Sequence, residues 1–368
     1  MIKIFREPTV YLLGRQEQDQ DQMQKFLSDH GVSWSTDTEI GAEALVETAG
    51  RLCFDDRTDV LTQTGWVRLA NLGEGEAVAT LNPATRDLEF QIPSQIHVYD
   101  YCGDLYEVNG RDVSFAVTPE HRVLAGLGKK AGFAAFEMHE ARSLVGKRFR
   151  VLTAPSGWRG TVADSVEIPG VEWSQVNANK FGVYGSRVGV LVSKSIGTVD
   201  AVISLAKLAT HYAANGSVCD QAEIGNGVVI YGREVKEVRA LAAALDWPTH
   251  VWTDPRNGCP RTIIGGGRIV ANWFEEECGR GFINKKLPRF VLDLPSNLLR
   301  EIWDILVKTD GHRDADGQEF FLSGSGQLAD QAQEILAKLG FSSSMGTIKG
   351  TNGPCNVVTK KLGRPAVV

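Results

Sequence analysis

The stretch CFDDRTDVLTQTGW (residues 53–66) opens a long region of short β segments. Hairpins are predicted where two apolar segments flank a turn, as in DVLT with GWVRL (59–69) and AVATL with LEFQI (77–92). Three further segments continue this pattern: QIHVYDY (95–101), LYEV (105–108) and VSFAV (113–117). The texture lasts to about residue 170. Residues 53–170 are therefore predicted to form an all-β module.

Cys53 and the downstream segment VTPEHRV (residues 117–123) together carry the groups needed to cut a peptide bond. A thiolate can attack the carbonyl before it, and an imidazole of near-neutral pKa can protonate the leaving amide nitrogen. Donors aimed at the carbonyl must also polarise the planar amide. This chemistry predicts that Cys53 supplies the sulfur, His121 the proton and Thr118 the hydroxyl, with Leu52–Cys53 as the target bond. The alternative is a buried cysteine and a surface turn that never meet.

The order and spacing of these segments resemble the N-terminal part of a Hint domain, the domain shared by hedgehog proteins and inteins. The resemblance rests on residues 53–66, on LNP (81–83), on VYDY (98–101) and on VTPEH (117–121). It implies a horseshoe-like all-β fold. It also implies that Cys53 is the nucleophile of an N–S acyl shift, and that Thr118 and His121 activate the junction. No cofactor is expected for this reaction.

From about residue 199 the pattern changes to alternating helices and strands, and an internal repeat is present. The segments AVISLAKLATHYAANG (201–216) and LLREIWDILVKTDG (298–311) are apolar-periodic helices that end in a small polar residue and a glycine, a plausible helix stop. A second helix follows each at nearly equal distance, over 233–247 and 327–341. Two copies of one helix–strand–helix unit are therefore predicted.

The two helix-plus-glycine motifs resemble those of LAGLIDADG (DOD-type) homing endonucleases, which are commonly embedded in inteins. In that family the motif helices pack face to face, each delivers a carboxylate to a shared divalent metal site, and adjacent sheets lie in the DNA major groove. The resemblance implies an α+β fold for residues 171–368, with Asp310 and Asn215 at the metal positions. Asp310 fits the family, but Asn215 stands where the family has Asp or Glu. We therefore expect a weakened, degenerate nuclease site that uses Mg²⁺ if it is active.

The clearest basic cluster lies between the two copies. It comprises Arg280, Lys285, Lys286 and Arg289. The cluster resembles the basic linking block of the same family, which implies contact with double-stranded DNA and a lysine that assists cleavage. For a bare Lys-Lys pair, the default interpretation is a solvated face.

Residues 1–52 differ in pattern from the β segments that begin at Cys53. A polar, Gln-rich stretch (16–27) precedes a predicted amphipathic helix (37–52) that runs directly into Cys53. The segment VETAGRLCF (46–54) resembles an early helix of flavin-dependent thymidylate synthases, which implies a short α/β host fragment, or N-extein. The flavin- and nucleotide-binding residues of that family lie further downstream. Neither FAD binding nor thymidylate synthesis is therefore expected here.

Composition places the chain among ordinary globular proteins. It has 368 residues, 43% of them hydrophobic and 23% charged, which is enough for two or three domains. The net charge of −6 does not indicate a nucleic-acid binder, so DNA contact must rest on a local basic face. Six scattered cysteines without a C-x-x-C motif, no signal peptide and no membrane-length apolar stretch predict a cytoplasmic protein without membrane contact.

The C-terminal sequence bears on whether splicing could be completed. A complete intein closes with His-Asn before Cys, Ser or Thr, whereas this sequence ends TKKLGRPAVV (359–368). After its second helix, the first copy continues through a predicted hairpin (262–264 and 268–270), whereas the second copy stops early. We therefore expect the N-terminal portion of an intein-bearing precursor, with a truncated second repeat and no splicing in cis. Two alternatives stay open: a working site-specific DNA endonuclease with a relic splicing domain, and the N-terminal half of a split intein that acts in trans with a separate C-terminal piece.

Overall fold

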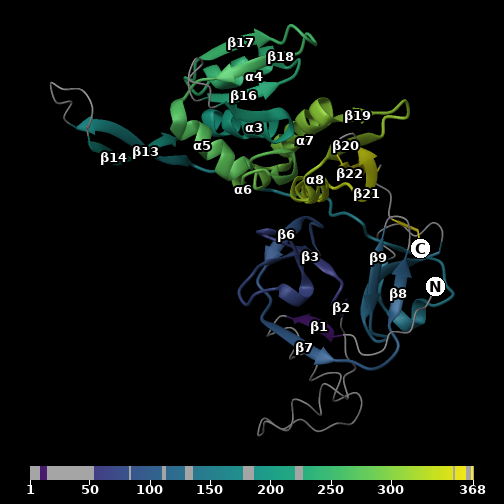
Figure 1. Cartoon of the computed structure of the whole chain (residues 1–368). Coiled ribbons are helices and arrows are strands. Elements are labelled where there is room, and N and C mark those ends of the chain that lie inside the picture. The colour runs from purple at the N-terminus through teal and green to yellow at the C-terminus, as the bar shows by residue number, and fades with distance from the viewer. Residues whose placement is uncertain are drawn as a thin grey trace. The chain divides into compact units, whose positions relative to one another are not determined.

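The computed structural model describes residues 9–14, 54–82, 84–109, 113–128, 136–176, 186–219, 227–350, 353–361 and 366–367. The chain divides into two compact units (Figure 1). The β unit comprises Met1–Ser156 together with Gly363–Val368, and the αβ unit comprises Gly157–Leu362. The sequence analysis placed this boundary between residues 170 and 171. Each unit is described by itself below.

The β unit consists of three antiparallel sheets. Their strand orders are β7-β1-β2-β9-β8, β4-β3-β5-β6 and β11-β10-β12-β23. The strands are β1 (Thr9–Gly14), β2 (Phe54–Asp55), β3 (Asp59–Thr62), β4 (Gly65–Arg68), β5 (Val78–Leu81), β6 (Leu88–Gln91), β7 (Gln95–Asp100), β8 (Tyr106–Asn109), β9 (Ser114–Val117), β10 (Arg122–Leu127), β11 (Phe136–Glu140), β12 (Phe149–Val151) and β23 (Ala366–Val367). In the part of this unit that the structure describes, the only helical elements are the 3₁₀ turns η1 (Leu69–Asn71) and η3 (Ala141–Leu144).

The predicted β content of this unit is confirmed. The first hairpin is β3–β4, and the second is β5–β6, whose turn is set by Asn82: its side-chain oxygen accepts the backbone N–H groups of Ala84 and Thr85. A small core of Ala125, Leu144, Phe149 and Val151 holds the third sheet. The predicted helix over 37–52 and Cys53 itself lie outside the described residues. The one described strand of the expected host fragment, β1, pairs with β2 and β7 of the β unit.

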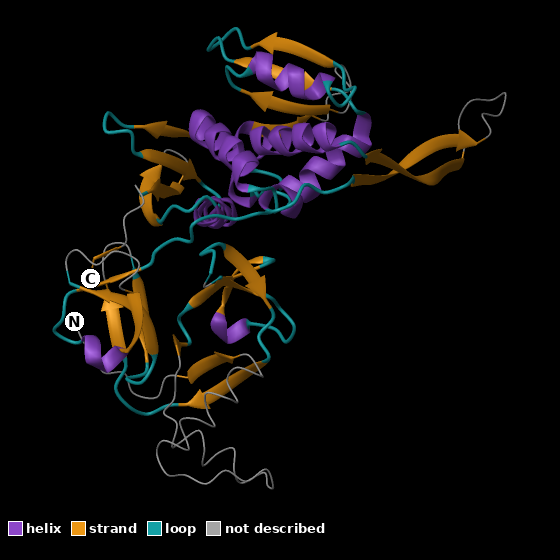
Figure 2. Cartoon of the chain, turned by 180° about the vertical axis from the view of Figure 1, so that it is seen from behind, coloured by secondary structure: helices purple, strands orange, loops and turns teal. Residues whose placement is uncertain are grey.

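The αβ unit begins with a long hairpin and continues with two similar halves. Its elements are β13 (Val166–Val176), β14 (Ser186–Ile196), α3 (Val199–Asn215), β15 (Gly216–Cys219), β16 (Gly227–Tyr231), α4 (Val235–Ala243), β17 (Thr249–Thr253), β18 (Pro260–Ile264), α5 (Gly267–Cys278), η4 (Phe282–Asn284), α6 (Arg289–Leu292), α7 (Ser296–Asp310), β19 (Gly311–Arg313), β20 (Glu319–Ser323), α8 (Gly326–Lys338), β21 (Ser343–Gly350) and β22 (Gly353–Lys360). The hairpin β13–β14 projects from the rest of this unit in both views (Figure 2).

The predicted repeat is confirmed at the level of topology. Each half runs helix, two strands, helix, two strands, and the sheets β15-β16-β18-β17 and β19-β20-β22-β21 have matching strand orders. One apolar core unites the helices with the inner faces of both sheets, and includes Trp303, Phe274 and Phe321, each fully buried. Apolar helix faces and alternating strands thus meet in one core.

Two details of the predicted repeat are wrong. Residues 268–270, expected as a strand, belong to helix α5, because Ile269, Val270, Trp273 and Phe274 recur at helical spacing and are all buried. The residues after Leu339, taken as too few to complete the second copy, form the hairpin β21–β22, which completes a four-stranded sheet.

The αβ unit is entered through a segment that is fixed to its helices. We call residues 157–165 the strap. Ser296 Oγ donates to the carbonyl of Trp158 at 2.6 Å and accepts its backbone N–H at 3.1 Å. The backbone N–H of Thr161 donates to the carbonyl of Asp293 at 2.7 Å, and Lys338 Nζ lies 4.7 Å from the Trp158 ring centroid. Among the described residues, no helix is both long enough and apolar enough to span a membrane.

Candidate functional site

The αβ unit brings the ends of its two motif helices together. Helix α3 begins after Thr198, whose hydroxyl accepts the backbone N–H of Ala201 at 3.3 Å, and it ends at Asn215. Helix α7 ends at Asp310, and the two helices pack against one another. Small residues on the buried side of α3, where close approach is easiest, are Ala206, Ala209 and Ala213. The two helix ends therefore deliver Asn215 and Asp310 to one place.

A glycine follows each helix, for a reason that the sequence did not reveal. Gly216 has φ −110° and Gly311 has φ −128°, so neither has the left-handed conformation of a typical glycine helix stop. A Cβ at Gly216 would lie 2.4 Å from Cδ2 of Tyr212, and one at Gly311 would lie 2.1 Å from the carbonyl oxygen of Phe320. Glycine is needed because the chain passes from helix to strand with no room for a side chain.

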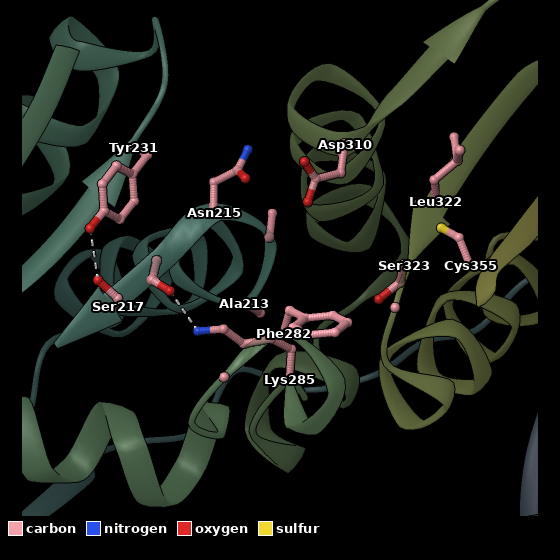
Figure 3. Close-up of a pocket in the computed structure, with 14 residues that line it drawn as sticks. Ala213, Asn215, Ser217, Tyr231, Phe282, Lys285, Asp310, Leu322, Ser323 and Cys355 are labelled. Carbon is pink, nitrogen blue, oxygen red and sulfur yellow. Dashed lines mark hydrogen bonds between the residues drawn. The ribbon is translucent and has the colours of Figure 1, made fainter. Parts of the chain in front are cut away.

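A cavity of about 560 Å³ lies at the two helix ends. Asn215 and Asp310 face it from two sides, and Lys285 lies along its floor (Figure 3). The two sheets supply the rest of the polar lining, through Ser217, Tyr231, Ser323 and Cys355. The cavity thus collects one acid, one amide and one amine between two sheets.

The pKa of the Asp310 carboxyl is shifted towards neutral pH. Burial raises its pKa to about 6, and a hydrogen bond with Asn215 opposes that rise. Above that pH the group carries a charge, which its hydrogen bond with the neutral amide of Asn215 does not neutralise. A partly dry carboxylate of this kind gains from a bound cation.

Lys285 connects the floor of the cavity to the end of α3. Its Nζ donates to the carbonyl of Gly216 at 2.8 Å and lies 3.6 Å from the Tyr212 ring centroid. The side chain is buried, and burial lowers its pKa to about 8. The ammonium therefore offsets the negative end of the α3 dipole, next to the position of Asn215.

The donor set allows a divalent cation but does not enclose one. Carboxylate and amide oxygens, as on Asp310 and Asn215, are the hard ligands that Mg²⁺ prefers, and Mg²⁺ keeps several waters. In the part of the chain that the structure describes, no group of three or more His, Cys, Asp or Glu could hold a metal ion. Asp310 and Asn215 therefore fit a weak site with one charged protein ligand. The asparagine at residue 215 had led us to expect such a site.

The four basic residues expected to face DNA do not share one surface. Lys285 is buried, and Arg289 donates to Glu334 and Asp293, with Nη2–Oε1 and Nη2–Oδ1 distances of 2.6 and 2.8 Å. Lys286 is half-buried, whereas Arg280 is exposed and lies 3.4 Å from Glu275. The sequence shows four cations within ten residues, but it does not show that Asp293, directly after α6, and Glu334 of α8 bind Arg289.

The cavity also contains residues that the sequence analysis missed. Ser217, Tyr231 and Cys355 come from strands, where alternation marks a face but not a function. The Tyr231 hydroxyl lies 3.2 Å from Ser217 Oγ (Figure 3). Of these three residues, only Ser217 could have been found from the sequence, because it lies two residues after Asn215.

In the β unit, the predicted Thr118 and His121 occupy one tight turn. The backbone N–H of His121 donates to the carbonyl of Thr118 at 3.1 Å, and the carbonyl of His121 accepts from Ala141 at 2.8 Å. Thr118 is fully buried. The His121 ring meets Phe54 edge-on, with ring centroids 4.4 Å apart. The third predicted residue, Cys53, lies outside the described residues.

Comparisons with known proteins give partial likenesses. No family model matches the chain. The ATP-dependent Clp protease proteolytic subunit of Chlamydomonas moewusii is 34% identical over 98 residues, which is 27% of this chain. The chain spans 10% of the length of that relative.

Two solved structures resemble part of the fold. One is the homing endonuclease I-DmoI in complex with DNA and Mn, 10% identical, covering 44% of this chain and 90% of that chain with a TM-score of 0.34. The other is the N-terminal LAGLIDADG domain of DUF199/WhiA, 13% identical, covering 44% of this chain and 77% of that chain with a TM-score of 0.30.

Proposed function

We propose that the β unit is a Hint-type self-processing module that cuts its own backbone between Leu52 and Cys53. The observation that carries this proposal is the contact of the His121 ring with Phe54, the residue directly after Cys53. The backbone pairing of Phe54 with Val117 holds the same two segments together. This contact supports a role for the imidazole as the proton donor at the junction.

The proposed step rearranges one amide into a thioester. The Cys53 thiolate attacks the carbonyl carbon of Leu52, a C–S bond forms and the C–N bond breaks. His121 gives a proton to the leaving nitrogen, which becomes the free amine of Cys53. The proton lost by the thiol restores the proton on His121. Thr118 directs its hydroxyl at the carbonyl oxygen as charge develops there.

The order of the units along the chain also supports an embedded arrangement. Strand β12 precedes the αβ unit in the sequence and β23 follows it, yet the two pair antiparallel through Arg150↔Val367 and Val151↔Ala366. The αβ unit therefore interrupts a β unit that is continuous in its hydrogen bonding.

Thiol-induced cleavage tests this function. Incubating the purified chain with dithiothreitol should release residues 1–52, as measured by intact mass spectrometry, because added thiol attacks the thioester. The variants Cys53→Ala and His121→Ala should lose or strongly slow this release. Cys102→Ala, which removes an exposed thiol elsewhere in the β unit, is the matched control and should cleave normally. The function is refuted if Cys53→Ala is still cleaved. It is also refuted if the unmodified chain is not cleaved.

A second function is favoured for the αβ unit by the cavity at the paired helix ends. Asn215 and Asp310, from equivalent helices of two matching halves, face one space bordered by two sheets. This arrangement supports a LAGLIDADG-type unit that binds double-stranded DNA. Its metal site is weak, because Asp310 brings the only carboxylate to the pair.

In this function the chain would position the metal ion with few protein ligands. When bound, Mg²⁺ would stabilise the charge that develops on phosphate oxygens during hydrolysis. Asp310 and Asn215 would hold the ion, and Lys285 would keep the end of α3 fixed through Gly216. Because the metal site has a single charged ligand, we expect the unit to bind DNA but to cleave it inefficiently.

Manganese titration tests the metal site. The chain should bind Mn²⁺ weakly, as measured by electron paramagnetic resonance, and Asp310→Asn should weaken binding by roughly tenfold or more, because it removes the charged ligand. Asp304→Asn is the matched control, since Asp304 lies on the same helix and its side chain is 51% exposed. Equal affinity in Asp310→Asn and the unmodified chain would exclude this site.

A further inference from the structure

The sheet of the first half has one packed face and one open face. Val228, Ile230 and Ile264 point into the helix core. The opposite face, which we call the open face, contains the cross-strand row Tyr231↔Arg261↔Trp252. Tyr231 also lines the cavity (Figure 3). This row runs from the cavity across β16, β18 and β17. Tyr231, Arg261 and Trp252 are at least partly exposed, whereas Val229 and Ile263 on the same face are buried.

The matching face of the second sheet is nearly free of charge. His312 stacks on Phe320 with ring centroids 4.5 Å apart, while Leu322 and Cys355 line the cavity. Along the described strands of both faces, the register leaves Arg261 as the only arginine or lysine. Its position on an inner strand, with a neighbour on each side, distinguishes it from the cations of the loops.

The guanidinium of Arg261 is held in one orientation. Its Cζ lies 5.2 Å from the ring centroid of Tyr231 and 4.7 Å from that of Trp252. One amino group, Nη2, donates to the carboxylate of Asp254, a residue that is fully buried. Arg256 donates to the same carboxylate through Nε and Nη2 at 3.0 and 2.8 Å. Hydrogen bonds from Arg256, with the charges of both arginines, hold the pKa of Asp254 well below its usual range.

Asp254 uses only part of the donor capacity of Arg261, whose Nε is buried without a hydrogen-bond partner among the described residues. The side chain of Arg261 is 29% exposed, and its Nη1 has no hydrogen-bond partner among the described residues. Two arginines share one carboxylate, so the cluster keeps one uncompensated positive charge. A planar donor group fixed by a carboxylate and by two rings is suited to a flat ligand with adjacent acceptors.

We propose that Arg261 reads a guanine in the major groove of double-stranded DNA. The proposal rests on the DNA-binding function of the αβ unit. Guanine presents two adjacent acceptors, O6 and N7, in the major groove, which admits β structure, and arginine is their commonest partner. A phosphate contact would need neither a fixed orientation nor a place in the middle of a sheet. Arg261 is therefore a specificity-determining residue.

Selection from a random DNA pool tests this role with the full chain. The probe is a set of duplexes of about 30 base pairs with a randomised centre, bound at low salt in EDTA and then sequenced. The unmodified chain should enrich a guanine at a defined position. Arg261→Lys keeps the charge but loses the fork, so it should lose that preference by about tenfold and retain its affinity for the unselected pool. Arg268→Lys, which changes an exposed arginine of α5 outside this cluster, is the matched control and should keep the preference.

A change in the DNA makes the test independent of any effect on folding. Replacing the selected guanine by 7-deazaguanine removes N7, so the affinity of the unmodified chain should fall by about tenfold. The affinity of Arg261→Lys should not change. Thermal unfolding of each variant shows whether the sheet is intact.

The possible results separate the inference from the function on which it rests. If the chain retains no duplex at low salt, the DNA-binding function itself fails, and the inference fails with it. If the chain binds DNA without enriching guanine, or if Arg261→Lys keeps the preference, only the inference is refuted. An equal loss of affinity for every sequence would make Arg261 a phosphate contact, which also refutes it.

Discussion

Asn215 and Asp310 hold equivalent places at the ends of α3 and α7, but only Asp310 carries a charge. Because Asn215 is neutral, the pair holds at most one negative charge, and burial raises the pKa of Asp310 to about 6. A divalent cation that has to shed water gains little from one carboxylate. The difference between an amide and an acid at residue 215 therefore decides the strength of the metal site.

Restoring the acid at this position should strengthen metal binding. In Asn215→Asp, two carboxylates would face the same cavity, so Mn²⁺ affinity should rise by about tenfold or more. Without metal the two charges repel, so the variant should unfold at lower urea than the unmodified chain and recover when Mn²⁺ is added. Asn297→Asp, at an exposed position on α7, is the control and should show neither effect. Unchanged Mn²⁺ affinity would contradict the assigned site.

At the scale of elements, a single carboxylate joins α7 to the second sheet. Glu319, at the start of β20, accepts from Trp303 Nε1 at 2.8 Å and from Lys360 Nζ at 2.7 Å, and it pairs with Arg300 and Arg313. Burial alone would raise its pKa, but hydrogen bonds from Lys360, Trp303 and Arg313 hold the value at about 2. Folding therefore depends on Glu319 being ionised.

Because its folded pKa is depressed, Glu319 stabilises the fold above its ordinary pKa of 4.5, and this stabilisation is lost as pH falls from there towards about 2. Glu319→Gln should lower the free energy of unfolding at pH 7 by about 3 kcal/mol, because Lys360, Arg300 and Arg313 all lose this charged partner. It should also flatten the acid slope of stability, as measured by urea unfolding followed by circular dichroism. Glu301→Gln, which removes an exposed carboxylate that pairs with the half-buried Lys207, should cost less than about 1 kcal/mol. An unchanged acid slope in Glu319→Gln would contradict this account.

Local pattern allowed the motif helices to be predicted, but not all of their surroundings. The apolar periodicity of α3 and α7 is set by adjacent residues, so the sequence alone carries it. Ile269 and Val270 favour a strand locally, but together with Trp273 and Phe274 they form a helical stripe that is buried in the core. Arg289 looked like a DNA contact because its partner Glu334 lies in another helix, a relation that no local spacing reveals.

At the scale of the whole molecule, the boundary between the units decides what folds together. The sequence placed it at residue 171, where the β texture fades, but the αβ unit begins at Gly157. The strap explains the difference. Trp158 and Val162 pack on the core of the αβ unit, and Ile168 within β13 is fully buried there. At Gly160, φ is +56° and a Cβ would lie 2.5 Å from the carbonyl oxygen of Leu294, so this glycine allows the close approach of the strap.

Two fragments should therefore differ in stability. Residues 157–362 contain the whole core of the αβ unit and should unfold cooperatively in urea. Residues 171–362 lack the strap and Ile168, which leaves Lys338 without the Trp158 ring and exposes apolar core. We expect this shorter fragment to lose at least about 2 kcal/mol, or to fail to fold, as measured by circular dichroism and urea titration. Equal unfolding midpoints for the two fragments would show that the strap is dispensable and that the unit begins where the sequence analysis had placed it.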